Sequence, residues 1–465
     1  MSLVPPLAGP CTRDSQSDPQ ANIITLNVGG EIFQTSPQTL DLAGPGSFLT
    51  TLACSKGASI PFIDRDPELF SILLYFLRTG ALPSKAKAFD PDDIISEAQF
   101  YNLVHLLNRP ITNSSEFDAF ELEKALILPL NGRDYPSAIA PFFDGSILVS
   151  HGSKITSFNW SLRKKTTVLT EFSAIDSLLA LSPDIAAAGA TDFSGLQIID
   201  SKLGSVLETL SWENQTHSGS NVQAIGSSPE LLFVSFESER RNSNSIVVFD
   251  RSSFQPVTEI GKQEIYGVDL LGSSIPCTKL NWSAGFNLLL SSGLHRGPSG
   301  FVSSIKLWDI RDNKAVWELH EKGDCFADLT VCDNVYGIFK VGVMSGDVFM
   351  ADLRKLGVDG PWVSLGGPMR KDGKREGVHC KLVSHGSHVF CSRGGDVELW
   401  SEVLMAHTNQ GRIEERVFRR NTLGAADNKE ESMITHLDFG GNRMILARKD
   451  EQMIEIWQSP AANLF

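Results

Sequence analysis

The hydrophobic residues near the start of the chain follow two different periods. Apolar and polar residues alternate over residues 24–28, which is typical of a strand with one buried face, and Gly29 and Gly30 favour a tight turn before a returning strand that begins at Ile32. Over residues 69–77 the apolar residues recur at steps of three and four, which predicts a helix with one apolar face. This part of the chain is therefore expected to form a small α/β domain.

A hydrogen-bonding side chain followed by proline marks three helix starts, at Ser36-Pro37, Asp66-Pro67 and Asp90-Pro91. The serine or aspartate oxygen can accept a backbone N–H that has no partner at the start of a helix, and proline fits the first helical position. Gly80 is placed to end the second of these helices, because glycine readily adopts the left-handed conformation that follows many helices.

From residue 118 onward the helical period gives way to short apolar runs that are separated by turns. A strand of alternating apolar residues with a large or acidic final residue occurs seven times: KITSFNW from Lys154, LQIID from Leu196, IVVFD from Ile246, IKLWD from Ile305, DVFMAD from Asp347, VELW from Val397 and IEIW from Ile454. Together with the apolar runs around it, each strand predicts a unit of four short strands. Seven such units indicate a β-propeller.

The last unit lacks its fourth strand, because only eight residues follow Trp457 and they include Pro460. The apolar segment FELEKALILPL at residues 120–130 precedes the first unit and has no other place in the pattern. We therefore expect it to form the outermost strand of the final blade and to tie the two ends of the domain together. A helix in this segment is the alternative.

Several separated motifs in the first quarter of the chain agree in order and spacing with one known domain. They are NVGG at 27–30, Phe33, Thr35, Thr39-Leu40, residues 47–49, FIDRD at 62–66, Phe70, YFLRTG at 75–80 and EAQFYNLVHLL at 97–107. This stretch resembles the BTB/POZ domain of the potassium-channel tetramerisation type. The resemblance implies a domain that assembles into rings of four or five copies and that, in many soluble relatives, binds cullin 3 to build a ubiquitin ligase.

The repeated units resemble a degenerate WD-repeat array. We thus predict an α/β BTB/POZ domain followed by an all-β, seven-bladed, WD-like propeller. The expected boundaries are a disordered tail at 1–20, the BTB/POZ domain at 21–109, a linker at 110–117, and the propeller at 118–465, with its final blade closed by about 120–130. This combination is similar to a group of proteins regarded as cullin 3 substrate adaptors.

Composition excludes several classes of partner and compartment. The net charge is −14, and both the first 110 residues and the remainder hold more acidic than basic residues, so nucleic acid is not an expected partner. No apolar run is long enough to span a membrane, and the proline-rich start does not resemble a signal peptide. Seven cysteines without a Cys-x-x-Cys pair suit a reducing compartment, which favours the cytoplasm, with the nucleus as a second location.

The sequence contains no phosphate-binding loop, nucleophile elbow, HExxH motif or kinase motif, so we expect a protein that is not an enzyme and that needs no cofactor. His379, Cys380, His385 and His388 are of zinc-ligand types, but their spacing matches no standard zinc finger. We therefore predict no metal site.

Candidate interaction residues in the BTB-like domain come mainly from the resemblance. Asp64, Arg65 and Asp66 are either a helix cap with solvated charges or an ion network between subunits, as in the relatives that this segment resembles. A cullin-binding surface would, by the same resemblance, use the loop before Ile60, the start of the helix at Pro67, and the helices from Asp92 to Leu107, including Tyr101. The short linker leaves no room for the helical pair with which many BTB adaptors also hold cullin.

The longest propeller loops are expected on one face, because connections alternate between the two faces of an antiparallel meander. These loops hold a local excess of basic residues: Arg240, Arg241, His295, Arg296, Arg370, Lys371, Lys374 and Arg375. One hypothesis is a binding face for an acidic or phosphorylated protein segment, because guanidinium groups pair with such oxygens. Ordinary solvated loop charges are the alternative.

The most economical function is that of a substrate adaptor. The BTB domain would assemble into a homo-tetramer or pentamer and bind cullin 3, while the propeller would hold the protein substrate. The alternative is an oligomeric signalling or trafficking scaffold with no role in ubiquitination.

Overall fold

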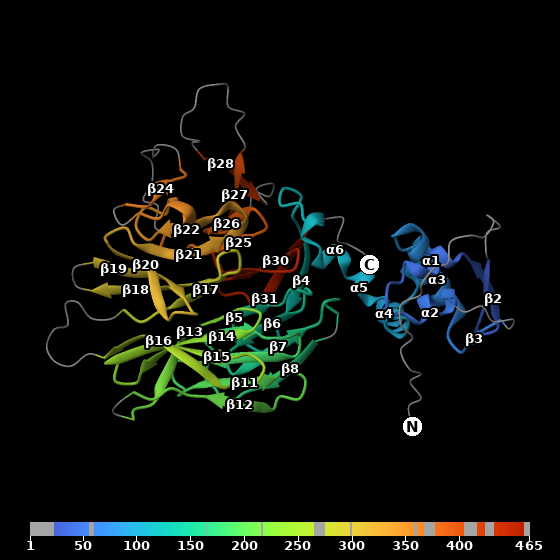
Figure 1. Ribbon diagram of the computed structural model, residues 1–465, viewed down its shortest axis with the longest axis horizontal. Coiled ribbons are helices and arrows are strands. Elements are labelled where there is room, and N and C mark those ends of the chain that lie inside the picture. The colour runs from blue at the N-terminus through green and yellow to red at the C-terminus, as the bar shows by residue number, and fades with distance from the viewer. Residues whose placement is uncertain are drawn as a thin grey trace, which may run out of the picture. The chain divides into compact units, whose positions relative to one another are not determined.

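The computed structural model describes residues 23–54, 60–163, 165–214, 217–264, 275–297, 300–357, 360–366, 377–403, 416–423 and 432–459. The chain divides after Pro110 into two compact units, which we call the head and the propeller (Figure 1). Among the described residues, no helix has both the length and the apolar character needed to cross a membrane.

The head combines a three-stranded sheet with short helices. In the sheet, β1 (Ile24–Val28) lies between β2 (Glu31–Thr35), to which it is antiparallel, and β3 (Phe62–Ile63), to which it is parallel. The helices of the head are α1 (Pro37–Asp41), α2 (Phe48–Cys54), α3 (Pro67–Thr79), α4 (Pro91–Phe100) and α5 (Val104–Leu107), with the 3-10 turn η1 (Ser84–Ala88). The boundary between the units falls within α6 (Arg109–Thr112), and the 3-10 turn η2 (Ser114–Glu116) belongs to the second unit. The ring of Phe70 on α3 meets that of Phe33 on β2 edge to face at 5.0 Å, so α3 packs against the sheet.

The three predicted helix starts are confirmed. Ser36 accepts a hydrogen bond from the N–H of Thr39, Asp66 accepts from Glu68 and Leu69, and Asp90 accepts from Asp92. In each case proline occupies the first turn, and α3 ends at Gly80 with a φ of 74°.

The propeller contains seven four-stranded antiparallel sheets in the part of the chain that the structure describes (Figure 1). Blade 1 consists of β5 (Pro136–Pro141), β6 (Ile147–His151), β7 (Lys154–Phe158) and β8 (Lys165–Leu169), blade 2 of β9 (Ser177–Ala180), β10 (Ile185–Gly189), β11 (Leu196–Asp200) and β12 (Val206–Leu210), and blade 3 of β13 (Ser220–Ser227), β14 (Leu231–Ser238), β15 (Ser243–Asp250) and β16 (Pro256–Glu264). Blade 4 consists of β17 (Lys279–Ser283), β18 (Leu288–Gly297), β19 (Gly300–Asp309) and β20 (Lys314–Lys322), and blade 5 of β21 (Phe326–Cys332), β22 (Gly337–Gly342), β23 (Val348–Asp352) and β24 (Val363–Ser364). Blade 6 consists of β25 (Leu382–His385), β26 (His388–Arg393), β27 (Asp396–Val403) and β28 (Val417–Leu423), and blade 7 of β29 (Ile434–Gly440), β30 (Arg443–Arg448), β31 (Met453–Gln458) and β4 (Glu123–Pro129). All seven strands that mark the repeat in the sequence are third strands of a blade.

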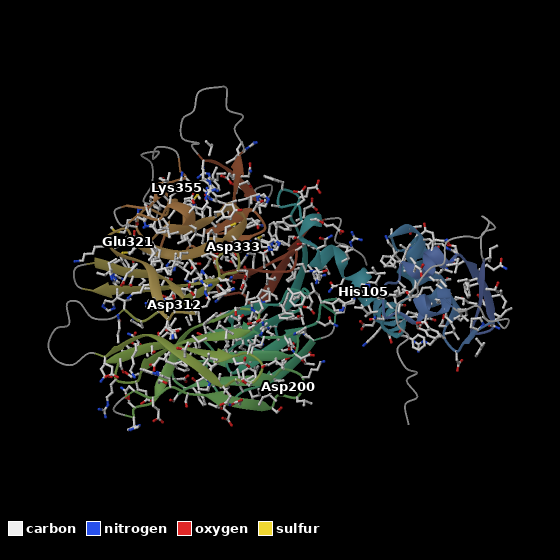
Figure 2. The ribbon with its side chains drawn as sticks, viewed as in Figure 1. His105, Asp200, Asp312, Glu321, Asp333 and Lys355 are labelled. Atoms are coloured by element: carbon white, nitrogen blue, oxygen red, sulfur yellow. The ribbon has the colours of Figure 1, made fainter. Side chains whose placement is uncertain are left out.

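The blades form a closed ring. The first strand of each blade contacts the first strand of the next, and β29 contacts β5. Each of seven apolar clusters joins residues of two adjacent blades, so the hydrophobic core lies between the blades. The short turns η3 (Asp333–Val335) and η4 (Leu353–Lys355) follow β21 and β23. Polar contacts also join the blades: Asp333 accepts from the N–H of Gly285, and Glu321 pairs with Lys340 at 2.7 Å. Asp333 and Glu321 are labelled in Figure 2.

The final blade takes its outermost strand from the start of the unit. β4 pairs antiparallel with β31, with Leu128 opposite Ile454 and Leu126 opposite Ile456. This strand falls within residues 120–130, where the missing strand was expected, and the helical alternative does not apply. The ring is thus closed by pairing two distant parts of the chain.

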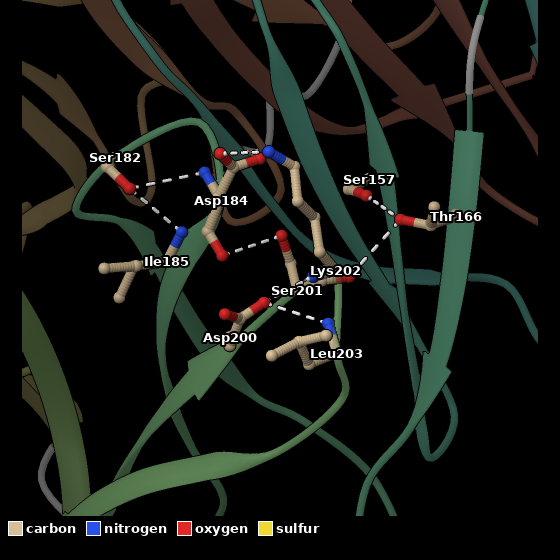
Figure 3. Close-up of polar contacts among 9 residues, drawn as sticks. All are labelled: Ser157, Thr166, Ser182, Asp184, Ile185, Asp200, Ser201, Lys202 and Leu203. Atoms are coloured by element: carbon tan, nitrogen blue, oxygen red, sulfur yellow. Dashed lines mark hydrogen bonds and ion pairs between the residues drawn. The ribbon is translucent and has the colours of Figure 1, made fainter. Parts of the chain in front are cut away.

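The aspartate that ends several of the repeated strands caps the turn to the fourth strand. Asp200 Oδ1 accepts hydrogen bonds from the backbone of Lys202 at 2.8 Å and of Leu203 at 2.9 Å (Figure 3). Asp250, Asp309 and Asp352 accept from backbone N–H groups in the same way. An aspartate bonding to the backbone two residues later is a recognised turn device, which explains its recurrence in the sequence.

The residues expected to form a linker are packed against the propeller. Asn442 donates from its backbone N–H to the carbonyl of Ile111 at 2.6 Å and from its side chain to that of Asn113 at 2.7 Å. Ile111 and Ala119 are buried, and the ring of Phe117 meets His385 edge to face. The connecting segment therefore contributes to the folded second unit.

Candidate protein-binding surfaces

The outward face of the sheet in the head carries two exposed apolar side chains. Leu26, Val28 and Ile63 point inward and are buried. Because side chains alternate between the two faces of a strand, the residues next to these three in the same strands point outward. On that side Asn27 lies between Ile32 of β2 and Phe62 of β3, which are 56% and 62% exposed. We call Asn27, Ile32 and Phe62 the outer sheet face. Apolar side chains that gather on a surface in this way mark interaction sites in soluble proteins.

The charged triplet before α3 is divided among three environments. Arg65 donates from Nε and Nη2 to Glu97 Oε2 at 2.9 and 2.6 Å, and its guanidinium lies 4.5 Å from the ring centroid of Phe100. Asp66 caps α3, which is the helix-cap alternative given for this triplet in the sequence analysis. Both residues thus have partners within the head, whereas Asp64, which is exposed like Asp66, is the remaining member of the triplet.

Tyr101 is one of the residues predicted to contact cullin 3, but the structure places its side chain in the core of the head. It is fully buried, with its ring against those of Phe70 and Phe100. Burial, and then the nearby carboxylate of Glu97, raise the pKa of Tyr101 well above its ordinary value. Because α4 turns this side chain into the core, Tyr101 supports the surface from inside and cannot touch a partner in this conformation.

The other three predicted residues are at the surface. Ile60 is 54% exposed and precedes β3, while Pro67 and Asp92 are half-buried at the N-terminal ends of α3 and α4. Their accessibility is compatible with the surface that the resemblance implies.

Two of the loops that hold the basic residues of the propeller meet at one carboxylate. Arg240 and Arg241 lie in the turn between β14 and β15, and His295 and Arg296 lie near the end of β18 in the next blade. Burial raises the pKa of Glu237, and the charges of Arg241 and His295 act against this rise, so both blades face the same acidic group. The surface is therefore less basic than the loop sequences alone suggest. Arg370, Lys371, Lys374 and Arg375 lie outside the described residues.

Three of the four residues of zinc-ligand type, His385, His388 and Cys380, are engaged in separate contacts. His385 stacks on Phe439 at 4.5 Å, and His388 Nδ1 lies 2.8 Å from Ser401 Oγ. The thiol of Cys380 interacts with that of Cys391. Within the described ranges, no three residues of ligand type are grouped so that they could hold a metal ion.

Comparison with known families assigns both units. Residues 24–110 match the BTB/POZ domain family, and residues 132–459 match the family described as the At2g24240-like, C-terminal beta propeller. The chain belongs to this BTB/POZ and propeller family. The BTB/POZ domain-containing protein At5g41330 of Arabidopsis thaliana is 54% identical over 452 residues, which cover 96% of this chain and 98% of that protein. At2g24240 of the same plant is 25% identical over 94% of this chain and 97% of its own length.

Two animal proteins match a short part of this BTB/POZ and propeller chain. The human BTB/POZ domain-containing protein KCTD3 is 38% identical over 93 residues, which are 19% of this chain and 11% of that protein. The bovine SH3KBP1-binding protein 1 is 39% identical over 97 residues, 20% of this chain and 13% of its own. BTB/POZ domains and propellers are typical of non-catalytic proteins that bind other proteins, which is the role that the exposed surfaces suit.

The structure adds two features that sequence reasoning missed. The outer sheet face was not proposed, although Ile32 begins the returning strand that the sequence predicts. The partner of Arg65, Glu97, was also not proposed. A signal for the first existed, because Ile32 falls between Glu31 and the inward Phe33 and so faces outward with an apolar side chain.

The stability of the propeller of this BTB/POZ protein is expected to fall as the pH drops from about 6.5 to about 4. Burial is the main cause that lowers the pKa values of His385 and His436, each from the ordinary 6.5 to about 4. In this window the unfolded chain binds protons at both histidines and the folded chain does not, so acid favours unfolding. Asp438, whose pKa burial raises to about 6, binds a proton in the folded state and offsets part of the loss.

Tryptophan fluorescence would follow the unfolding of the propeller and not that of the head, because all eight tryptophans lie between residues 160 and 457. In His385→Phe the thermal midpoint should depend less on pH between 4 and 6.5 than in the wild type. An unchanged pH dependence would show that His385 does not contribute.

Proposed function

We propose that the chain is a substrate adaptor of a cullin 3 type ubiquitin ligase in the cytoplasm. The head assembles into a ring of four or five copies and binds cullin 3, and the propeller holds the protein to be modified. The observation that carries this proposal is the outer sheet face, which has two exposed apolar side chains, Ile32 and Phe62, on a domain of the BTB/POZ family.

Self-association is supported by the surface of the head. Besides Ile32 and Phe62, the exposed large apolar residues of the head include Phe48, Tyr75 and Phe100. Burying such groups against a second copy removes apolar area from water and favours assembly. A ring would also bring several propellers together, so that weak contacts with a multivalent substrate add up.

Cullin 3 would bind near the N-terminal ends of α3 and α4. Ile60, Pro67 and Asp92 are accessible there, and Tyr101 holds α4 in place from the core. Asp64 would add a charge at the edge of this surface or between subunits.

The propeller would hold its substrate on the face where the loops between second and third strands gather. Arg240, Arg241, His295 and Arg296 are exposed there and can pair with carboxylate or phosphate oxygens. The substrate would accordingly present an acidic or phosphorylated segment.

The oligomer is tested by charging the outer sheet face. The full chain has a mass of 50.8 kDa, and light scattering should give four or five times this value for the wild type. The double variant Ile32→Arg, Phe62→Arg should shift to the mass of one chain, because two buried cations would oppose association. Leu203→Arg is the matched control, since Leu203 is 79% exposed on a propeller turn and its substitution should leave the mass unchanged. A double variant that keeps the wild-type mass would exclude this face as the subunit contact.

Cullin binding is tested separately with the N-terminal region of cullin 3 as bait. The wild type should be retained, and Asp92→Lys should be lost from the bait while its mass by light scattering stays that of the oligomer. If the oligomeric wild type is not retained, the alternative function is favoured: a signalling or trafficking scaffold without a role in ubiquitination.

A further inference from the structure

Two buried thiols lie side by side in blade 6. Leu382 of β25 stands opposite Cys391 of β26, and Cys380 lies two residues before Leu382. Because side chains two residues apart on an extended chain point to the same side, Cys380 shares a side with Leu382 and therefore with Cys391. Both cysteines belong to the apolar cluster between blades 5 and 6, where they are 5% and 0% exposed.

The backbone around the pair brings the two sulfur atoms close together. Ser392 donates from its N–H to the carbonyl of Lys381 at 2.8 Å, and Lys381 donates from its N–H to Ser392 Oγ at 2.7 Å, so the segment that holds Cys380 is bonded to the segment that holds Cys391. The two thiols are in hydrogen-bonding contact. Cys380 precedes β25 and lies outside the regular strand, so a small displacement of this residue is enough to bring the sulfurs to the roughly 2 Å of a disulfide bond.

The two thiols differ in acidity. The hydrogen bond from Cys391 lowers the pKa of Cys380, and the charge of Arg393 adds to this effect, although burial acts in the opposite direction. The same hydrogen bond, and then burial, raise the pKa of Cys391. Arg393 is held by an ion pair with Glu398 at 2.8 Å. Because the thiolate is the nucleophilic form, Cys380 is the thiol that reacts with an oxidant, and Cys391 is placed to react with the product.

The other three cysteines that the structure describes have different partners. Cys277, Cys325 and Cys332 each donate a hydrogen bond to a backbone carbonyl. Cys332 lies in the same apolar cluster as the pair, yet no second thiol is among the groups that act on it. The contact between two thiols therefore distinguishes Cys380 and Cys391, and burial alone does not.

We propose that Cys380 and Cys391 form a reversible disulfide when the protein meets hydrogen peroxide. The thiolate of Cys380 attacks one peroxide oxygen, the O–O bond breaks, and the hydroxide that leaves takes up a proton to become water. The resulting sulfenic acid is attacked at sulfur by Cys391, the S–O bond breaks, and a second water leaves with the proton of the Cys391 thiol. Two thiols are oxidised to one disulfide, and one peroxide is reduced to two waters.

The bond would make blade 6 sensitive to the redox state of its surroundings. It would tie the segment before β25 to β26, and so fix the first strand of the blade to the second. In a reducing compartment the pair stays as two thiols, and the disulfide forms only while an oxidant is present. The proposal is independent of cullin binding and of the oligomeric state.

Tryptic peptides of the full chain test the proposal directly, because Lys381 lies between the two cysteines. After treatment with hydrogen peroxide, alkylation of free thiols and digestion, residues 376–381 and 382–393 should be recovered as one linked species whose mass is lower than that of the two peptides by two hydrogen atoms. Dithiothreitol should release the two peptides. In Cys391→Ala the same treatment should leave a sulfenic acid at Cys380 that dimedone labels, because no second thiol remains to displace it.

Cys277→Ser is the control variant, since the half-buried thiol of Cys277 has no thiol partner, and it should form the linked species to the same extent as the wild type. Tryptophan fluorescence should give Cys391→Ala a thermal midpoint within a few degrees of the wild type, and the wild-type peptides decide the matter if that variant does not fold. Peroxide-treated wild type without the linked species, a link from either cysteine to Cys332, or a folded Cys391→Ala that dimedone does not label would each overturn the proposal.

Discussion

Replacing Glu455 with alanine is expected to lower the free energy of unfolding of the propeller by about 3–5 kcal/mol, the usual effect of removing one partner of a buried ion pair. Arg448 Nε lies 2.9 Å from Glu455 Oε1, and their side chains are 3% and 6% exposed. Lys124 of β4 and the indole N–H of Trp457 also bond to this carboxylate, each at 3.0 Å. Glu455 thus connects three strands of the blade that closes the ring.

The loss follows from leaving cations without their counter-charge in the closing blade. Burial acts to raise the pKa of Glu455, but hydrogen bonds from Arg448, Lys124 and Trp457 outweigh it, so the pKa lies below its ordinary value. The ionised carboxylate therefore stabilises the fold above its unfolded pKa, and this contribution is lost as the pH falls through the lower folded value. Arg448 also donates to the carbonyls of Gly395 and Ser432 at 2.9 Å, so the charge left behind in Glu455→Ala stays fixed in a buried place.

Denaturation followed by tryptophan fluorescence would measure the loss. The double variant Arg448→Met, Glu455→Met should recover much of it, because replacing a whole buried pair by apolar groups is often neutral. The matched control is Lys202→Ala in the pair with Asp184 on blade 2, where the side chains are 64% and 45% exposed (Figure 3). That exposed pair should contribute less than about 1 kcal/mol. A Glu455→Ala variant as stable as this control would contradict a closing role for the network.

The sequence is informative about the propeller because its pattern repeats. The third strand of each blade packs between neighbouring blades, so the same short pattern of alternating apolar residues with a large or acidic final residue recurs in every unit. The aspartate after several of these strands recurs because Asp200 and its counterparts bond to the following turn. The missing strand of the last unit could be assigned to residues 120–130 because a closed ring requires it, and β4 lies there.

The contacts that form the candidate surfaces could not be predicted from the sequence in the same way. The outer sheet face depends on the parallel pairing of Asn27 with Phe62, and a two-residue strand leaves no periodic trace in a sequence. The placement of Tyr101 depends on where the last turn of α4 meets the core. In the propeller, Glu237 becomes a neighbour of His295 only when two blades pack together.

Replacing Arg65 with methionine is expected to destabilise the head by about 3 kcal/mol, at the lower end for breaking a buried pair because the Arg65 side chain is 32% exposed. Glu97 is 3% exposed and would lose both hydrogen bonds from the guanidinium. Arg65→Lys should recover only part of this stability, because an ammonium can neither form the same two bonds nor lie flat over Phe100. Hydrogen exchange of the amides in α3 and α4 would measure the change without interference from the propeller.

The same variants decide between the two roles proposed for the charged triplet. If Arg65 acts within the head, the double variant Arg65→Met, Glu97→Met should exchange more slowly than Arg65→Met alone, because no buried carboxylate is left unpaired. Its mass by light scattering should remain that of the wild type. If Arg65 instead bridges subunits, both variants should lose mass to the same extent, and removing Glu97 should restore nothing. Asp64→Asn is the informative comparison, since Asp64 is exposed: a loss of mass in this variant alone would place the contact between subunits at Asp64, one residue before the internal pair.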